Sequence, residues 1–519
     1  MYAFFRRLVC GFAGIFLAAA LPLSAQDITL RSADGTVEVS GTLLDYDGEF
    51  FRIDTRFGEM TLNALGLSCI GLACPDPGQF AADITLSGND TAISGLLPGL
   101  IEAFGFSRGM TTLRQDHGRA GWTYFISDAA RVPLARLQAS AAVSGRAIGD
   151  IIADRADIAI TTRLPAEPEL ELARTASAGD LASPYRRQVL AIDALVFIVS
   201  PLNPVRALSL EDIAAIYSGR ISNWADLGGI DAPIALYRRQ AGSELAGAFA
   251  AAVFPDGPPA PMPGRAFRND RDLSDTLARD PFGLGYTGFA GVRNARALAL
   301  RGACGIRMPV TMFNLQAGDY PLTRYYYVLR PARRLPVFAR SFLTWLDSDA
   351  AQLAIADLGF VGQDLHRLTL ADQPERIANA IRNAGEDVEL PALQGLVTTL
   401  GAAERLSATL RFDDNSTNMD ARSERNIRLL ADMLELGEFD GREIIIAGFS
   451  DGEGSATGNR RISRARAEQV QAALSAAASR ADLSKIRFRT IGLGEVSPLA
   501  CDDTPEGRRI NRRVEIWLR

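Results

Sequence analysis

Apolar and polar residues alternate in short runs over the first part of the chain. Between residues 27 and 78, runs such as Phe51-Arg52-Ile53 are separated by the pairs Asp34-Gly35 and Asp47-Gly48. A period of two is typical of half-buried strands, and an Asp-Gly pair is typical of a hairpin turn. Residues 26–79 are therefore predicted to form a small β module, with an accessory or docking role.

A second pattern, in which strands and amphipathic helices alternate, extends over residues 80–365. Apolar runs at 84–86 and 192–199 predict buried strands, and the runs 96–104 and 210–217 predict helices. This order is typical of an α/β domain, in which ligands bind where strand ends meet helix N-termini. We therefore expect a ligand site at the polar turns that follow these strands.

Residues 366–405 separate this domain from the last one. The segment begins with charged and polar residues and becomes apolar toward Leu400. Gly385, Pro391 and Gly395 interrupt its helical pattern, because glycine and proline weaken or end a helix. We therefore predict a broken helical linker.

The pattern restarts between residues 406 and 519. The run 443–449, which is apolar after Glu443, predicts a buried strand, and Ser463 is predicted to open a helix whose apolar face includes Val470. Alternating apolar residues at 514–518 predict a final strand. These elements indicate an α+β domain.

The N-terminus has the pattern of an export signal. Residues 1–25 contain Arg6 and Arg7, then an apolar run, then Leu23-Ser24-Ala25. This arrangement is typical of a cleaved secretory signal peptide, and an uncleaved N-terminal anchor is the alternative. No later stretch reaches about 20 uninterrupted apolar residues, so we expect no transmembrane span in the mature chain.

Composition limits the chemistry that the chain can perform. Its 519 residues correspond to three or four domains, and 55 basic against 61 acidic residues argue against a nucleic-acid-binding surface. The only two histidines, His117 and His366, leave little room for a histidine-rich metal site or for histidine acid–base catalysis. We expect no metal, no cofactor and no enzymatic activity.

The cysteines have different expected fates. Of the five, Cys10 lies in the signal segment, and an exported chain can form disulfides. Cys69 and Cys74 enclose four residues, so a local bridge is predicted. Cys304 and Cys501 can pair only if their two domains touch, and a bridge and two buried thiols both remain open.

Within residues 80–365, several stretches in order resemble the periplasmic phosphate-binding proteins of ABC transporters. The resemblance implies a two-lobed α/β domain of the type II periplasmic-binding-protein class. The matching stretches are 191–204, 208–229, 238–249, 283–286, 320–324 and 359–361.

The resemblance also implies an anion site formed by Thr91, Thr161, Thr162, Arg239 and Ser243. A guanidinium and several hydroxyl and backbone donors can replace the hydration shell of phosphate or a similar oxyanion. For each threonine, a capping or turn hydrogen bond is the alternative.

One departure from the family bears on the ligand. The chain has Ser243-Glu244-Leu245 where the family has Ser-Gly-Thr. One hydroxyl is lost, and the Glu244 carboxylate is expected to repel phosphate unless its side chain turns outward. Two hypotheses therefore remain: a site for a small oxyanion, and a domain that has lost its ligand and serves as an interaction module in a structural envelope protein.

Four C-terminal stretches resemble the OmpA-like peptidoglycan-binding domains, namely 448–454, 459–467, 492–498 and 504–516. The resemblance implies that Asp451 and Arg466, with Asn459 nearby, bind diaminopimelate of the peptidoglycan stem peptide. A carboxylate and a guanidinium suit its adjacent ammonium and carboxylate groups, and a structural Asp–Arg bridge is the alternative. A structural role is expected for three residues at the last strand, Asn511, Arg512 and Arg513.

The sequence thus predicts a multidomain α/β and α+β protein of the periplasm of a Gram-negative cell. Its predicted function is to bind a small solute while held on peptidoglycan, in association with the outer membrane. The predicted parts are a signal peptide (1–25), a small β module (26–79), a two-lobed binding domain (80–365), a linker (366–405) and an OmpA-like α+β sandwich (406–519).

Overall fold

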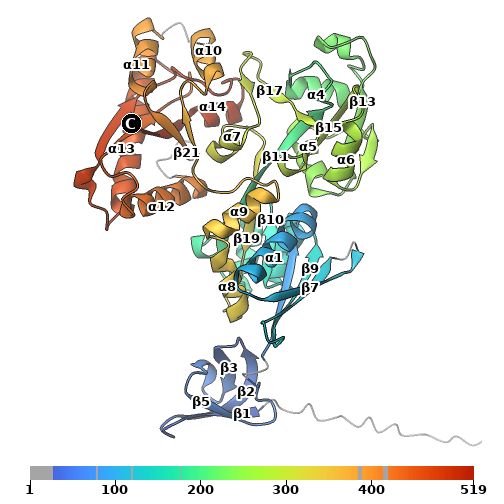
Figure 1. Cartoon of the computed structure of the whole chain (residues 1–519), viewed down its shortest axis with the longest axis vertical. Coiled ribbons are helices and arrows are strands. Elements are labelled where there is room, and N and C mark those ends of the chain that lie inside the picture. Colours follow the sequence, from blue (N-terminus) through green and yellow to red (C-terminus); the bar gives the residue numbers. More distant parts are fainter. Residues whose placement is uncertain (1–26, 77–79, 119–120, 177, 384–387, 413–418) are drawn as a thin grey trace, which may run out of the picture. The chain divides into compact units, whose positions relative to one another are not determined.

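The computed structural model describes residues 27–519 except for 77–79, 119–120, 177, 384–387 and 413–418 (Figure 1). The predicted signal peptide lies outside the described residues. The chain divides into two compact units, Met1–Phe80 and Ala81–Arg519. None of the described helices has the length and apolar character needed to cross a membrane.

The first unit is an antiparallel sheet with the strand order β4-β3-β2-β1-β5. Its alternating apolar residues, such as Ile28, Leu30, Phe51 and Ile53, form a small core. Asp47 Oδ1 accepts two backbone hydrogen bonds, at 2.8 and 2.7 Å, and so closes the turn between β2 and β3. This is the β fold that the alternation predicts. Its strands are β1 (Asp27–Ser32), β2 (Glu38–Tyr46), β3 (Phe50–Thr55), β4 (Gly58–Asn63) and β5 (Leu67–Ile70).

The second unit begins with a lobe in which helices cover a mixed sheet of order β19-β10-β6-β9-β8-β7. Residues such as Ala147, Ile151 and Ala173 of α2 and α3 pack against Ala159 of β10 in its core. Its strands are β6 (Ala82–Gly88), β7 (Thr111–Asp116), β8 (Trp122–Ser127), β9 (Pro133–Ala141), β10 (Ile158–Thr161) and β19 (Thr323–Leu329). Its helices are η1 (Ala92–Leu96), α1 (Leu97–Ser107), α2 (Ser144–Ile152), α3 (Glu167–Thr175), α8 (Val337–Trp345) and α9 (Asp349–Asp357).

The second lobe has its own apolar core, which includes Val196, Ile216, Phe249 and Tyr286. Its strands are β12 (Ala207–Leu208), β13 (Ala235–Arg239), β14 (Arg265–Phe267), β15 (Gly283–Gly288), β16 (Arg296–Ala297), β17 (Ala299–Arg301) and β18 (Arg307–Met308). Its helices are α4 (Leu210–Tyr217), α5 (Glu244–Val253), α6 (Asp270–Leu277) and α7 (Met312–Ala317).

One long strand belongs to both lobes. The first half of β11 (Arg187–Val199) pairs with β19, and its second half pairs with β15 and β16. The two lobes therefore share a continuous strand between their cores (Figure 1). This arrangement confirms the predicted two-lobed α/β fold.

The C-terminal part is a sheet of order β20-β21-β24-β22-β23 with helices on both faces (Figure 1). Its strands are β20 (Arg367–Thr369), β21 (Glu404–Arg411), β22 (Glu443–Gly448), β23 (Arg487–Gly492) and β24 (Arg513–Leu518). Its helices are α10 (Pro374–Arg382), α11 (Leu390–Leu400), α12 (Ala421–Glu435), α13 (Ala456–Ala477) and α14 (Pro505–Asn511).

The segment 366–405, predicted as a linker, is part of this C-terminal fold. Ile444 and Ile446 of β22 pack in the core that α12 and α13 cover, whereas Ile445 packs on the opposite face with Leu396 and Leu400 of α11. Because successive residues of a strand face opposite sides, a strand that is apolar throughout needs cover on both faces. Helices α10 and α11, which lie within residues 366–405, cover this second face of β22.

The long helix α13 also differs from the prediction. It begins at Ala456, where Ser455 caps it by accepting a hydrogen bond from the backbone N–H of Gly458 at 3.2 Å, and not at Ser463. The first turns bury small and polar residues, Ala456 and Asn459, and carry no apolar periodicity that could reveal them, so the cap alone marks the start. Arg466 therefore lies within the helix and not in its first turn.

A disulfide joins the two-lobed domain to the C-terminal domain. Cys304 and Cys501 are paired across a sequence separation of 197, which resolves the alternative that the sequence leaves open. Cys69 and Cys74 form the predicted local bridge in the first unit.

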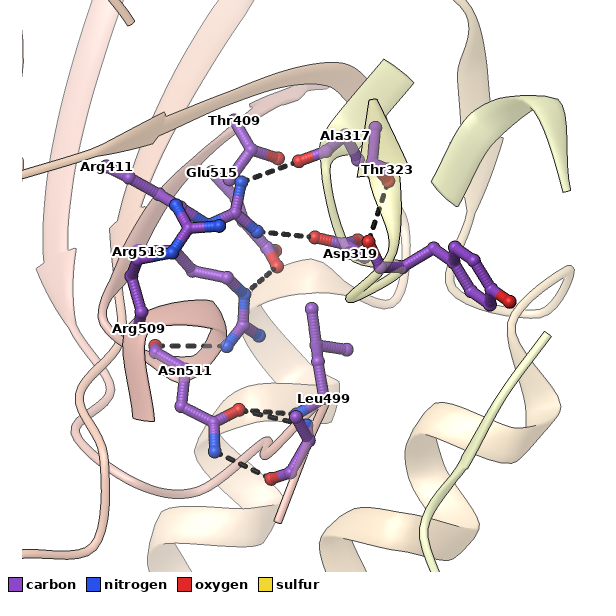
Figure 2. A network of polar contacts seen from close by, with 12 residues as sticks. Ala317, Asp319, Thr323, Thr409, Arg411, Leu499, Arg509, Asn511, Arg513 and Glu515 are labelled. Carbon is purple, nitrogen blue, oxygen red and sulfur yellow. Dashed lines mark hydrogen bonds and ion pairs between the residues drawn. The ribbon is translucent and has the colours of Figure 1, made fainter. Parts of the chain in front are cut away.

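A buried network of charges also spans this joint (Figure 2). Asp319, which follows α7, forms ion pairs with Arg405 and Arg411 of β21 at 2.8 and 2.9 Å. Glu515 of β24 pairs with Arg376 at 2.9 Å and with Arg513 at 2.7 Å. The four arginines are at most 4% exposed, and they outnumber the two carboxylates in this buried region.

Aromatic rings offset part of the positive charge that the two carboxylates leave unbalanced. The guanidinium of Arg513 lies 4.1 Å from the ring centroid of Phe449, and that of Arg376 lies 5.4 Å from Trp517. Arg405 lies 5.2 Å from the ring centroid of Phe313. Because the face of an aromatic ring attracts a cation, most strongly where water is absent, these rings stabilise the surplus arginines.

The network predicts a loss of stability in acid. Burial alone would raise the pKa of Asp319 and Glu515, but the surrounding arginines outweigh it and lower the pKa of both carboxyls. A carboxyl whose pKa is lower in the folded than in the unfolded chain stabilises the fold above its unfolded pKa and loses this effect as the pH falls. Urea unfolding between pH 7 and pH 3 should therefore show a free energy of unfolding that falls below about pH 4.5, by up to about 1.4 kcal/mol per pH unit for each group. A flat profile down to pH 3 would contradict this expectation.

Candidate functional site

The two lobes meet at a carboxylate from one and hydrogen-bond donors from the other. Glu244, the first residue of α5 in the second lobe, extends to Ser144, the first residue of α2 in the first lobe. The backbone N–H of Ser144 donates to Glu244 Oε2 at 2.8 Å, and its hydroxyl donates to Oε1 at 2.6 Å. The hydroxyl of Thr162 donates to the same Oε1 at 2.6 Å. One carboxylate thus accepts three hydrogen bonds from the opposite lobe.

The surroundings of this carboxylate favour a negative charge. It lies at the N-terminus of α2, where unpaired N–H groups and the helix dipole attract anions. The backbone N–H of Thr162 donates to Ser144 Oγ at 2.9 Å, which leaves the Ser144 proton free for Glu244. Glu169, and to a smaller extent Glu244, raises the pKa of Arg163. The carboxylate of Glu244 therefore occupies a position that would suit a small oxyanion.

Arg239, predicted to hold the anion, is paired with protein acceptors. It ends β13 and is 2% exposed. Its guanidinium donates to Asp270, to Asp90 at 3.1 Å and to the carbonyl of Arg268 at 2.7 Å. Because Asp90 belongs to the first lobe, this ion pair is a second contact between the lobes.

The remaining predicted anion residues have different surroundings. Ser243 caps α5 by accepting from the backbone N–H of Ala246 at 3.3 Å. Thr161 is fully buried and its hydroxyl donates to the carbonyl of Arg163 at 2.8 Å, a turn hydrogen bond. The backbone N–H of Thr91 donates to Asn89 Oδ1 at 2.9 Å. Among the five predicted residues, Thr162 alone donates to Glu244.

Ser144 is a residue of this site that was not predicted from the sequence. The signal for Ser144 was a Ser-Gly pair between the end of β9 and the start of an amphipathic helix, which is typical of a helix start. Glu244 was expected to repel phosphate unless its side chain turned outward, and in the structure it does not turn outward. It turns toward the first lobe because the unpaired donors there satisfy it.

A second cluster lies at the end of β22 in the C-terminal domain. Asp451 follows this strand, is 8% exposed and accepts from Arg512 Nη1 at 2.9 Å. Arg466 of α13 is half-buried, with its guanidinium 5.9 Å from the ring centroid of Phe412. Burial and the charge of Arg512 lower the pKa of Arg466, and the charge of Asp451 opposes them. One carboxylate and two guanidinium groups therefore share this cluster.

Three consecutive residues before and at the start of the last strand, Asn511, Arg512 and Arg513, have different surroundings. Arg513 is fully buried in the network described above, whereas Arg512 lies beside Asp451. Arg512 is the C-cap of α14, whereas Arg513 is the first residue of β24. Asn511 has a structural role, since its amide bonds the backbone of Leu499 and Ala500 (Figure 2).

Asn459, predicted to lie with the peptidoglycan ligands, is buried under the turn that follows β23. Its side-chain N–H donates to Glu495 Oε2 at 2.6 Å. This contact ties α13 to that turn. The structure therefore gives Asn459 a positioning contact, and Asp451, Arg466 and Arg512 form the charged part of the cluster.

Comparisons with known proteins match both parts of the second unit. A family described as the PBP superfamily domain matches residues 81–350, and the OmpA family matches residues 411–512. The phosphate-binding protein PstS of Bacillus subtilis is 26% identical over 172 residues, which is 32% of this chain and 55% of that protein. The probable lipoprotein YiaD of Escherichia coli is 35% identical over 107 residues, which is 21% of this chain and 46% of that protein.

The chain thus spans about half the length of these curated relatives. The crystal structure of an ABC-type phosphate transport receptor from Vibrio cholerae is 21% identical and aligns with 54% of this chain and 99% of its own, with a TM-score of 0.39. Since the first match covers more than half of its 519 residues, the chain belongs to the PBP superfamily and also carries an OmpA-family domain.

Proposed function

We propose that this chain is a peptidoglycan-anchored binding protein of the periplasm of a Gram-negative cell. The observation that carries the proposal is the cluster of Asp451, Arg466 and Arg512 at one end of the OmpA-family domain. An envelope location agrees with the printed name of YiaD, a probable lipoprotein. The predicted signal peptide agrees with export.

The chemistry of the cluster suits diaminopimelate. Its free α-amino acid end carries an ammonium and a carboxylate on the same carbon atom, so a receptor needs one carboxylate and one guanidinium. In this proposal Asp451 accepts from the ammonium and Arg466 donates to the carboxylate. Arg512 holds the Asp451 side chain in place through their 2.9 Å contact.

Retention on peptidoglycan tests the anchor. We expect Asp451→Ala and Arg466→Ala each to weaken binding of the mature chain to purified peptidoglycan by about 10-fold or more, since loss of one partner of a charge-assisted hydrogen bond costs about 1.5–3 kcal/mol. Co-sedimentation with increasing amounts of peptidoglycan measures this.

Arg464→Ala is the matched control. It removes an arginine from the same helix, and its partner Glu468 lies on the exposed surface. It should bind peptidoglycan as the wild type does. If Asp451→Ala and Arg466→Ala are retained on peptidoglycan as well as Arg464→Ala and the wild type, the proposed anchor is wrong.

For the two-lobed domain, we propose a small oxyanion, phosphate or a relative of it, as the ligand class. The N-terminus of α2 and the hydroxyls of Ser144 and Thr162 provide suitable donors, and the relative PstS is named as a phosphate-binding protein. The second candidate is an interaction module without a free ligand, and the Glu244 contact favours it. Calorimetry of the mature chain with phosphate and sulfate separates the two, because only the first predicts heat of binding.

A further inference from the structure

We propose that Glu244 is a built-in ligand of the two-lobed domain. Its carboxylate fills the donor set of the first lobe, ties the lobes together without a solute and competes with any free oxyanion. The inference rests on the proposed ligand class, and it holds for either candidate function of the domain.

The contacts of Glu244 are those expected of a bound anion. Its two oxygens accept one backbone N–H and two hydroxyl hydrogen bonds, at 2.8, 2.6 and 2.6 Å. All three donors belong to the first lobe, and Ser144 is 1% exposed. An ordinary surface glutamate at a helix start would instead point into water. The donors are therefore committed to a carboxylate that comes from the same chain.

A tethered carboxylate has two advantages over a free anion. Its effective concentration at the donors is set by the short distance between the lobes, so it binds without the entropy cost that a free anion pays. A second anion at the same donors would lie within a few ångströms of the carboxylate, where like charges repel strongly in a partly buried site. A free oxyanion can therefore bind only if Glu244 leaves.

The second lobe offers no free guanidinium at Arg239 to compensate for this repulsion. Arg239 is fully enclosed, and its terminal nitrogens donate to Asp270, Asp90 and the carbonyl of Arg268. Asp90 and Asp270 add negative charge near it. The balance of charge around Arg239 thus also disfavours an additional anion.

Titration calorimetry of the mature chain with inorganic phosphate tests the proposal. Glu244→Ala should bind phosphate at least 10-fold more tightly than the wild type, because it frees the donors and removes the repulsion. Glu244→Gln keeps the side-chain volume but not the charge, and its affinity should lie between the two. Adding Ser144→Ala to Glu244→Ala should return the affinity to the wild-type level or below it.

Glu211→Ala is the matched control, since it removes a glutamate from the first turn of α4 in the same lobe, at an exposed position. It should leave phosphate binding unchanged. If Glu244→Ala binds phosphate no more tightly than the wild type, or does not bind it, the proposal is overturned.

The same titrations distinguish failure of the built-in ligand from failure of the proposed oxyanion ligand. A wild type that gives no heat with phosphate while Glu244→Ala binds it would remove the oxyanion candidate and support the built-in ligand. A wild type that binds phosphate tightly, with Glu244→Ala no better, would support the oxyanion candidate and overturn the built-in ligand. Retention on peptidoglycan should be the same for all these variants.

Discussion

Glu515→Gln should lower the free energy of unfolding of the second unit by about 3–5 kcal/mol, which is the usual cost of removing one partner from a buried ion pair. Glu515 is fully buried and forms ion pairs with three arginines, Arg376, Arg405 and Arg513, at 2.9, 3.3 and 2.7 Å. It also accepts from the indole N–H of Trp517 at 3.0 Å. A neutral amide removes the carboxylate that pairs with Arg376 and Arg513 and leaves Arg405 with Asp319.

The arginines are already close to the limit of what their site tolerates. Burial lowers the pKa of Arg513 to about 9, against the opposing effect of Glu515. Without Glu515, ring faces and backbone carbonyls are the main partners left to Arg513. We therefore expect the variant to lose more stability than a typical core substitution, for which about 1 kcal/mol is common.

Urea unfolding of the mature chain, followed by tryptophan fluorescence, measures the loss. Trp517 packs beside Arg376 and reports on this region directly. Glu468→Gln is the control, since its pair with Arg464 is exposed and should contribute less than about 1 kcal/mol. A loss below about 1 kcal/mol for Glu515→Gln would mean that the aromatic rings alone stabilise the arginines.

Much of the architecture follows from periodicity and motif, because both are local. The alternation around Phe51 and Ile53 predicts a sheet with one buried face, and the structure has this sheet. The apolar run that follows Glu443 in β22 predicts a buried strand, yet it does not say what covers each face. The second cover comes from residues 366–405, whose pattern alone suggests a connector.

The candidate sites divide in the same way. The sequence placed Asp451 and Arg466 in one hypothesis because a motif with fixed spacing connects them, and in the structure they lie in one cluster with Arg512. The contact of Glu244 with Ser144 joins residues 100 positions apart on different lobes. Such a contact depends on how the lobes close, and no local pattern encodes that.

Replacing both Cys304 and Cys501 by serine should have an effect of similar size to that of Glu515→Gln. The bridge closes a loop with a sequence separation of 197, and the chain-entropy relation gives about 5 kcal/mol for a loop of this length. Most of this effect comes from the unfolded chain, which becomes less restricted without the bridge. Because Cys501 is only 5% exposed, burial of the serine hydroxyl adds to the loss.

The same substitution at Cys69 and Cys74 provides a control within the chain. That bridge has a sequence separation of 5, for which the same relation gives about 2 kcal/mol, and it lies in the first unit. Urea unfolding under oxidising conditions should show the larger loss for the Cys304/Cys501 variant, and only that variant should destabilise the second unit. Equal losses, or none in the second unit, would mean that the buried network of Asp319, Arg405 and Arg411 holds the joint without the bridge. In that case the joint would unfold as one body whether or not the cysteines are oxidised.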